Sequence, residues 1–125
     1  MEHPPAKRHT ILVIDDDLAI LEAIKLTLQD AGHEVETSTK DGRYINERIR
    51  KRRPDLIILD MLLSGHDGRD ICKRLKSQEE TSDIPILMIS AHPNARHASL
   101  EAGADDFLAK PFDIDELLDM VERYL

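Results

Sequence analysis

Acidic residues stand directly at the ends of two apolar runs in this sequence. The run Ile11–Ile14 is followed by three aspartates, Asp15–Asp17, and the run Leu56–Leu59 is followed by Asp60. A carboxylate at the end of a buried strand is costly unless a partner compensates its charge. Several such carboxylates in one place repel each other unless a cation joins them, and hard oxygen ligands favour Mg²⁺ or Mn²⁺ over zinc. These acids are therefore candidates for a magnesium site.

A hydroxyl group and an amine follow two further apolar runs. Ser90 follows the run Ile84–Ile89, and Lys110 follows Phe107–Ala109. Taken singly, each is best explained as an ordinary residue at a strand end. Taken with the acids and a metal, they supply a hydroxyl and a cation for holding a phosphate group, and a carboxylate can attack phosphorus to form an acyl phosphate. Asp60 is the candidate nucleophile.

The elements that must position these side chains alternate between strand and helix. Parallel strands need crossover connections, so this alternation predicts a doubly wound parallel sheet with helices on both faces, and ligands bind beyond the carboxyl ends of its strands. The second strand is followed only by Ser38 and Thr39, which predicts an edge strand. The expected strands cover 11–14, 34–37, 56–59, 84–89 and 107–109, and the helices follow near 18–28 (ending at Gly32), 45–49, 71–75, 95–102 (ending at Gly103) and 113–121.

Composition bounds the function. The 125 residues fit one domain, and 3% aromatic residues make a base-stacking surface for nucleic acid improbable. The formal charge of −8 argues against direct binding to nucleic acid or to an anionic membrane. The single cysteine, Cys72, excludes an intrachain disulfide and is expected on a buried helix face. No apolar run is long enough to span a membrane, and Met1–Arg8 lacks the apolar segment of a signal peptide. We therefore expect a cytoplasmic protein.

Several other features have simple structural explanations. We expect Asp17 to cap the first helix, Asp67-Gly68 to form a turn, and the basic run Arg48–Arg53 to be a solvated helix end rather than a nucleic-acid patch. Three histidines have no metal-ligand spacing and do not predict a zinc site, namely His66, His92 and His97.

From Thr10 to Leu125 the chain resembles the receiver domain of bacterial two-component response regulators, including the chemotaxis regulators. The segment ILVIDDD resembles the first strand and acidic pair of that family, and LIILDMLLSGHDG resembles the phospho-acceptor strand with its loop. ILMISA resembles the strand with the switch hydroxyl, and FLAKPF the lysine motif. The resemblance implies a flavodoxin-like sheet of five strands in the order 2-1-3-4-5, preceded by a flexible tail over residues 1–9.

The resemblance also implies a metal-dependent phospho-acceptor. A histidine kinase or histidine phosphotransfer protein would donate a phosphoryl group to Asp60. Mg²⁺ would be held directly by Asp16 and Asp60, by Asp15 through water, and by the main-chain carbonyl of Leu62. Such a chain is not an enzyme in the usual sense, although it promotes its own phosphorylation and dephosphorylation.

A conformational switch is implied as well. Ser90 and Lys110 would hold phosphoryl oxygens, and Phe107 would turn inward as Ser90 moves, which would reshape the face near the fourth helix and fifth strand. Homodimers through the fourth helix, fifth strand and fifth helix follow from the same resemblance. The chain departs from the family in having Ser64-Gly65 where a proline is usual.

Three alternatives stay open at this point. A phosphatase of the haloacid-dehalogenase type also uses a strand-end aspartate with Mg²⁺, but it usually needs a second acid two residues later, where this chain has Leu62. A flavin- or nucleotide-binding protein would meet repulsion from Asp15–Asp17. A receiver-like module could bind a partner without phosphorylation. The sequence also leaves open whether the domain acts alone or within a larger regulator.

Overall fold

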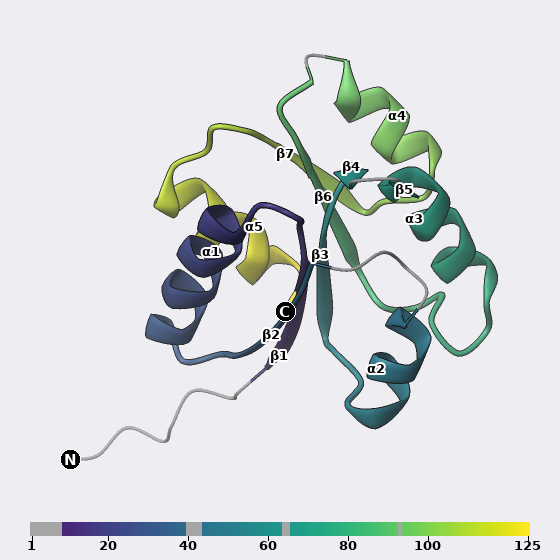
Figure 1. Ribbon diagram of the computed structural model, residues 1–125, viewed down its shortest axis with the longest axis horizontal. Helices are drawn as coiled ribbons and strands as arrows, with labels where there is room; N and C mark the ends of the chain where they lie inside the picture. The colour runs from purple at the N-terminus through teal and green to yellow at the C-terminus, as the bar shows by residue number, and fades with distance from the viewer. Residues whose placement is uncertain (1–8, 40–43, 64–65, 93) are drawn as a thin grey trace.

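The computed structural model describes residues 9–39, 44–63, 66–92 and 94–125 (Figure 1). The expected tail over residues 1–9 lies outside this part of the chain, except for His9. The elements follow in the order β1 (Thr10–Ile14), α1 (Leu18–Asp30), β2 (Glu34–Ser38), α2 (Ile45–Lys51), β3 (Leu56–Asp60), β4 (Leu62–Leu63), β5 (His66–Asp67), α3 (Gly68–Ser77), β6 (Ile86–Ser90), α4 (Ala95–Glu101), β7 (Asp106–Ala109) and α5 (Ile114–Arg123).

Five of the strands form one parallel sheet in the order β2-β1-β3-β6-β7. Counting only the strands of this sheet gives the order 2-1-3-4-5, so the predicted doubly wound fold is confirmed. β2 lies at an edge, as predicted from Ser38 and Thr39 at its carboxyl end, and the three central strands are almost wholly buried.

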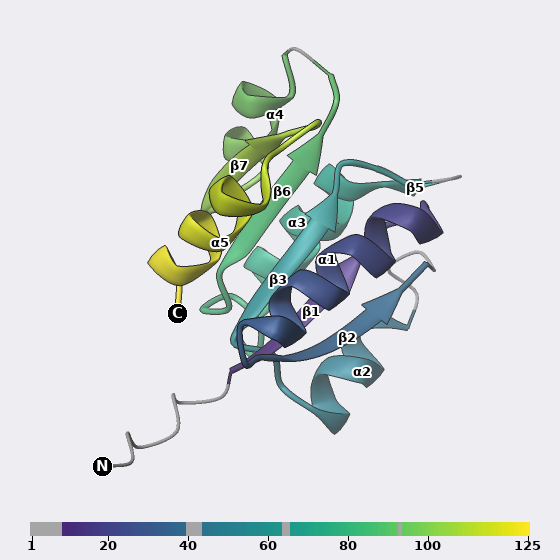
Figure 2. The ribbon, with the colours of Figure 1, turned by 90° about the vertical axis from the view of Figure 1, so that its left-hand side faces the viewer.

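Helices cover both faces of the sheet (Figures 1 and 2). Alternate residues of β1 point to opposite faces, as the pleat of a strand requires. Leu12 and Ile14 belong to the core that includes residues of α2, α3 and α4, whereas Ile11 and Val13 belong to the core that includes residues of α1 and α5. The two cores that result are almost entirely aliphatic, and Cys72 is fully buried in the first, as predicted.

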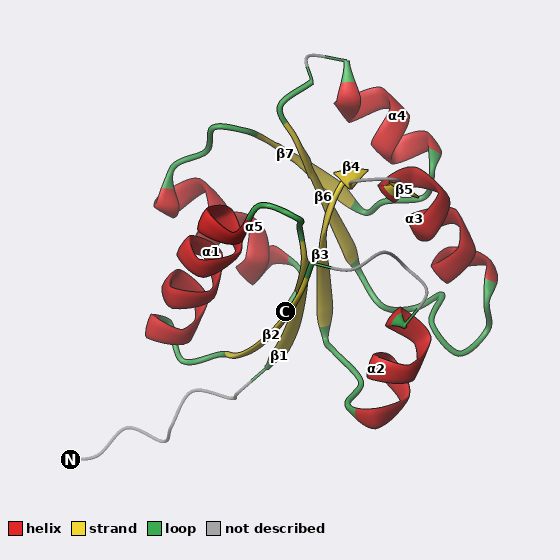
Figure 3. Cartoon of the chain, in the orientation of Figure 1, coloured by secondary structure: helices red, strands yellow, loops and turns green. Residues whose placement is uncertain are grey.

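A short antiparallel hairpin of β4 and β5 follows the central strand and was not predicted (Figure 3). Each of its strands has two residues, too few for a periodic pattern to appear in the sequence. The fourth strand of the sheet also begins later than predicted, at Ile86 rather than Ile84. The main-chain N–H of Ile84 donates to the carbonyl of Thr81 in a turn, and Pro85 has no N–H to contribute to a ladder.

Helix ends follow their capping residues. The Asp17 side chain accepts from the main-chain N–H groups of Ala19 and Ile20, so the predicted cap of α1 is confirmed. Gly32 follows the C-terminal end of α1 with φ of 97°, in the left-handed region that glycine tolerates best. Asp113 and Glu116 form a capping box at the start of α5.

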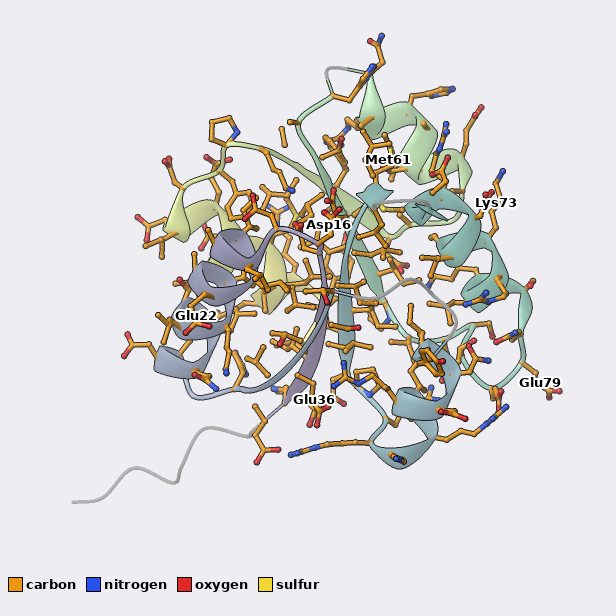
Figure 4. All side chains as sticks on the ribbon, in the orientation of Figure 1. Asp16, Glu22, Glu36, Met61, Lys73 and Glu79 are labelled. Atoms are coloured by element: carbon orange, nitrogen blue, oxygen red, sulfur yellow. The ribbon has the colours of Figure 1, made fainter. Side chains whose placement is uncertain are left out.

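The basic end of α2 is tied to the edge strand β2. Arg48 donates to the main-chain carbonyl of Thr37 at 2.6 Å and lies 3.7 Å from the Glu36 carboxylate. Arg52 forms ion pairs with Glu34 and Glu36, and the latter side chain is labelled beside α2 in Figure 4. This run is a paired, solvated helix end, as predicted.

Candidate functional site

The acidic side chains converge at the carboxyl end of the sheet. β1 and β3 run side by side with Ile14 opposite Leu59, so the next residues, Asp15 and Asp60, are neighbours across the two strands. Asp15, Asp16 and Asp60 each offer a ligand oxygen, and these atoms lie within 4.8 Å of one another. In Figure 4 the labelled Asp16 and Met61 lie close to this end of the sheet.

Burial differs among the three acids. Asp15 is 0% exposed and Asp60 is 6% exposed, whereas Asp16 is open to solvent. One of the Asp15 oxygens accepts from the main-chain N–H of Asp17 at 2.9 Å, which fixes the turn leaving β1. The cluster therefore combines two buried carboxylates with one that solvent can reach.

Lys110 supplies the positive charge at this pocket. Its Nζ donates to Asp15 Oδ2 at 2.9 Å and lies 3.4 Å from Asp60 Oδ2. The lysine reaches this place because its main-chain N–H donates to the carbonyl of Ser90 at 2.9 Å, which aligns the end of β7 with that of β6. Burial alone would lower the pKa of Lys110, but the two carboxylates outweigh it and raise that pKa. Lys110 is therefore a permanent cation here.

Asp60 has the most perturbed carboxyl group of the pocket. Burial, and next the charge of Asp15, raise its pKa to about 6, against the opposing effects of Lys110 and of the main-chain N–H of Leu62. That N–H donates to Asp60 Oδ1 at 3.4 Å. The ionised form of Asp60 is thus under-compensated by the protein alone, as expected of a group that needs an additional cation.

Ser90 stands at the end of β6, on the far side of Asp60 from β1. The hydroxyl is 2% exposed and accepts from the main-chain N–H of His92 at 3.0 Å. Asp60 pairs with Ile89 in the ladder, so Ser90, the last residue of β6, lies one position beyond Asp60 at the carboxyl end of the sheet. The carboxyl end of the sheet therefore brings together the five residues that the sequence predicted for the site, Asp15, Asp16, Asp60, Ser90 and Lys110.

Gly68 is a site residue whose role the sequence did not reveal. Its main-chain N–H donates to the carbonyl of Met61 at 2.7 Å. A β-carbon at position 68 would overlap the carbonyl oxygen of Asp60 and lie 2.9 Å from the Cα of Met61. Asp67 belongs to β5 and caps α3 rather than forming a simple turn. Only glycine lets α3 begin directly against the end of β3.

Phe107 and Leu62 have contrasting environments. Phe107 is 7% exposed and packs in the core beneath α4, so its ring is already inward in this structure. The Leu62 side chain is 56% exposed, and the main-chain N–H of this residue is the group that contacts Asp60. The side chain of Met61, which stands between Asp60 and Leu62 in the chain, is buried and accepts a weak hydrogen bond from the Ser99 hydroxyl at 3.8 Å.

The donor chemistry of the pocket fits a hard divalent cation. Three carboxylates and a nearby main-chain segment offer oxygen ligands, and one acid is exposed, which leaves room for water. Mg²⁺ prefers oxygen ligands and retains several waters. In the part of the chain that the structure describes, no other three acidic, histidine or cysteine side chains come together in this way.

Comparison with known proteins decides the family. The family model for the response regulator receiver domain matches residues 11–122. The chain belongs to this family. Receiver domains of this family are signal transducers rather than enzymes, they bind Mg²⁺ in an acidic pocket, and they interact with histidine kinases or phosphotransfer proteins.

Sequence relatives of this receiver domain include transcriptional regulators. It is 40% identical over 117 residues to the DNA-binding dual master transcriptional regulator RpaA of Synechocystis, covering 92% of this chain and 48% of that protein. It is 42% identical over 110 residues to the response regulator MprA of Mycolicibacterium vanbaalenii, covering 86% and 46%. The receiver domain thus spans about half the length of these relatives.

Solved structures agree with the fold. A response regulator from Chloroflexus aurantiacus superimposes on the receiver domain with a TM-score of 0.88 at 42% identity, covering 94% of this chain and 98% of the other. The chemotaxis protein CheY4 of Vibrio cholerae gives a TM-score of 0.85 at 34% identity, covering 95% and 100%. Within the described residues of the receiver domain, no helix has the length and apolar character needed to cross a membrane.

Proposed function

We propose that this receiver accepts a phosphoryl group on Asp60 from the phosphohistidine of a sensor kinase or phosphotransfer protein. The observation that carries the proposal is the setting of Asp60, a nearly buried carboxylate 3.4 Å from the Lys110 amine and grouped with Asp15 and Asp16. In the transfer, an Asp60 oxygen forms a bond to phosphorus as the bond from phosphorus to the donor imidazole nitrogen breaks. The electron pair returns to that nitrogen, which then takes a proton.

Different residues would bind the metal ion and the phosphoryl group. Asp16 and Asp60 would hold Mg²⁺ directly, Asp15 through water, and Leu62 through its main-chain carbonyl. When bound, Mg²⁺ neutralises charge on the phosphoryl oxygens and on the carboxylates. Asp15 also holds Lys110 at the pocket, since the two side chains are hydrogen-bonded at 2.9 Å.

Ser90 and Lys110 would bind the incoming phosphoryl oxygens. In the present arrangement the Ser90 hydroxyl accepts from the His92 N–H, which leaves its own proton available to donate to such an oxygen. Phe107 is the expected second member of the switch. Because its ring is already buried, we propose that phosphorylation holds an inward arrangement in place rather than creating it.

The face formed by α4, β7 and α5 is the proposed output surface. Leu100 on α4 is 42% exposed, and the His97–Glu101 pair lies beside it in the sequence. Across the face, Tyr124 donates to the Asp106 carboxylate at 2.8 Å. We propose that phosphorylation favours homodimers through this surface.

Two alternatives have less support. Leu62 occupies the position where a haloacid-dehalogenase-type phosphatase needs its second acid, and its side chain is exposed and uncharged. A module that acts without phosphorylation would have no need for Lys110 and two buried acids in one place, since burying such a group adds a desolvation cost.

The proposal is tested by intact-mass spectrometry. The protein is incubated with phosphoramidate, with and without Mg²⁺, beside Asp60→Asn and the control Asp119→Asn, which changes an exposed acid on α5. We expect one Mg²⁺-dependent phosphoryl adduct, labile to hydroxylamine, in the wild type and the control but not in Asp60→Asn. An adduct that persists in Asp60→Asn, or steady phosphate release with no adduct, would overturn it.

A further inference from the structure

Two histidines lie side by side at the opposite end of the sheet from Asp60. His9 immediately precedes β1 and His33 immediately precedes β2. The main-chain N–H of Glu34 donates to the carbonyl of His9 at 2.9 Å, and Thr10 is registered with Glu34. Positions 9 and 33 therefore extend the parallel ladder by one pair, and the ladder places their side chains on the same face.

The two imidazole rings are close but make no hydrogen bond through Nδ1. Their centroids are 5.8 Å apart and the ring planes are inclined by 53°. The Nδ1 atoms of both rings are buried and have no hydrogen-bond partner. Two buried polar nitrogens without partners in one place are unusual, because each loses its hydration without compensation.

The ring separation is close to that of two imidazoles on one metal ion. Imidazole nitrogen binds Zn²⁺ at about 2.0–2.1 Å, so each ring centre would lie about 3.2 Å from the ion. At the tetrahedral angle, two such rings have centres about 5.2 Å apart. The observed 5.8 Å is about 0.6 Å wider, so the two rings would close slightly on binding an ion.

The surroundings supply charge and access. Glu122 on α5 carries a negative charge that acts on His33, so an acidic side chain lies in the neighbourhood of the pair. His33 also lines a polar groove of about 390 Å³ together with Gln29, Glu34 and Arg52, which connects the histidine to solvent. Burial, and next the neighbouring His9, lower the pKa of His33, which favours the neutral imidazole that binds metals.

We propose that His9 and His33 form a second metal site, which takes a borderline-soft divalent ion such as Zn²⁺, with Glu122 and water completing the coordination. Nitrogen ligands distinguish this site from the oxygen-lined pocket at Asp60, which suits Mg²⁺. A bound ion would join β1, β2 and α5 at the end of the sheet that the phosphoryl chemistry leaves unused. Among the described residues, only Asp15, Asp16 and Asp60 already place three ligand atoms close together. The histidine site therefore has two ligands in place, and Glu122 would move to the ion when it binds.

The first test is a Zn²⁺ titration by calorimetry, in saturating Mg²⁺, on the full chain carrying Asp60→Asn to weaken the acidic pocket. His9→Gln and His33→Gln are compared with His97→Gln, a control at an exposed histidine of α4. We expect one Zn²⁺ site whose affinity falls more than tenfold in the first two variants and is unchanged in the control. Equal affinity in all variants, or no Zn²⁺ binding, would overturn the proposal.

A second measurement needs no substitution at the pair. Zn²⁺ added to the unaltered, nitrogen-15-labelled protein should shift the imidazole signals of His9 and His33 and leave those of His97 in place. Signals of the pair that do not respond would refute the site even if a variant fails to fold. Because phosphorylation at Asp60 is read separately by mass, failure of the histidine site and failure of the phospho-acceptor are distinguishable.

Discussion

The amine of Lys110 lies closer to Asp15 than to Asp60. It is 2.9 Å from Asp15 Oδ2 and 3.4 Å from Asp60 Oδ2. The fully buried Asp15 thus holds the Lys110 amine at a position where it also contacts Asp60. Asp15 depends on this lysine for charge compensation in the metal-free protein.

Removing that amine should destabilise the metal-free domain. Lys110→Met leaves Asp15 buried without its cation, and breaking a buried ion pair in this way costs roughly 3 kcal/mol. Lys110→Arg, which keeps the charge, should cost less. Urea unfolding with and without Mg²⁺ measures both, and we expect Mg²⁺ to recover part of the loss. A Lys110→Met variant as stable as the wild type without Mg²⁺ would contradict this.

Stability should depend on pH through Asp60. Its folded-state pKa of about 6 lies above its usual value of 3.8. Between about pH 4 and about pH 6, Asp60 is therefore protonated to a greater extent in the folded protein than in the unfolded chain. The free energy of unfolding should therefore fall as the pH rises from about 4 to about 6, and the penalty should be complete above that range.

The Asp60→Asn variant removes this penalty. At pH 7 without Mg²⁺ it should be more stable than the wild type by roughly 1 to 3 kcal/mol, given about 1.4 kcal/mol for each unit of pKa. Asp119→Asn serves as the control, and saturating Mg²⁺ should narrow the difference. Parallel stability curves for the wild type and Asp60→Asn from pH 4 to 7 would rule out this role for Asp60.

Gly68 and Gly32 offer a matched pair of substitutions. Gly68→Ala forces a β-carbon onto the carbonyl of Asp60, whereas Gly32→Ala meets no atom within 4 Å and only strains a backbone with φ of 97°. Each should lower stability by roughly 1 to 3 kcal/mol. Only Gly68→Ala should slow phosphorylation from phosphoramidate, because only it displaces the acceptor. Equal phosphorylation rates would show that the pocket tolerates the shift.

The proposed dimer surface can be tested with a similar pair. Sedimentation of the protein with Mg²⁺ and beryllofluoride, a phosphoryl mimic, should show a dimer that Leu100→Glu on α4 abolishes. Leu26→Glu replaces a comparably exposed leucine on α1, 57% against 42% exposed, and should leave the dimer intact. A monomer in all conditions would exclude the surface.

The sequence predicted the sheet and the position of the site for a clear reason. Uninterrupted aliphatic runs mark buried parallel strands, and the residue after each run must lie at the ligand-binding end. Asp60, Ser90 and Lys110 were found in this way. The family resemblance predicted the strand order, which alternation alone did not.

Other features depend on contacts that no local pattern encodes. The role of Gly68 arises from the approach of α3 to β3, so the sequence shows only a turn-forming dipeptide. The adjacency of His9 and His33 depends on the register between two strands whose starting residues the apolar pattern does not fix. The inward ring of Phe107 likewise depends on how α4 packs.

The contacts between α2 and β2 have a consequence for solubility. An edge strand exposes carbonyl and N–H groups that can pair with a strand of another molecule and start aggregation. The Arg48 side chain donates a hydrogen bond to the Thr37 carbonyl, and Arg52 forms ion pairs with Glu34 and Glu36 on the same strand. A strand from a neighbouring molecule would have to displace two guanidinium groups before it could pair, so this edge of the sheet is protected against intermolecular β-sheet growth.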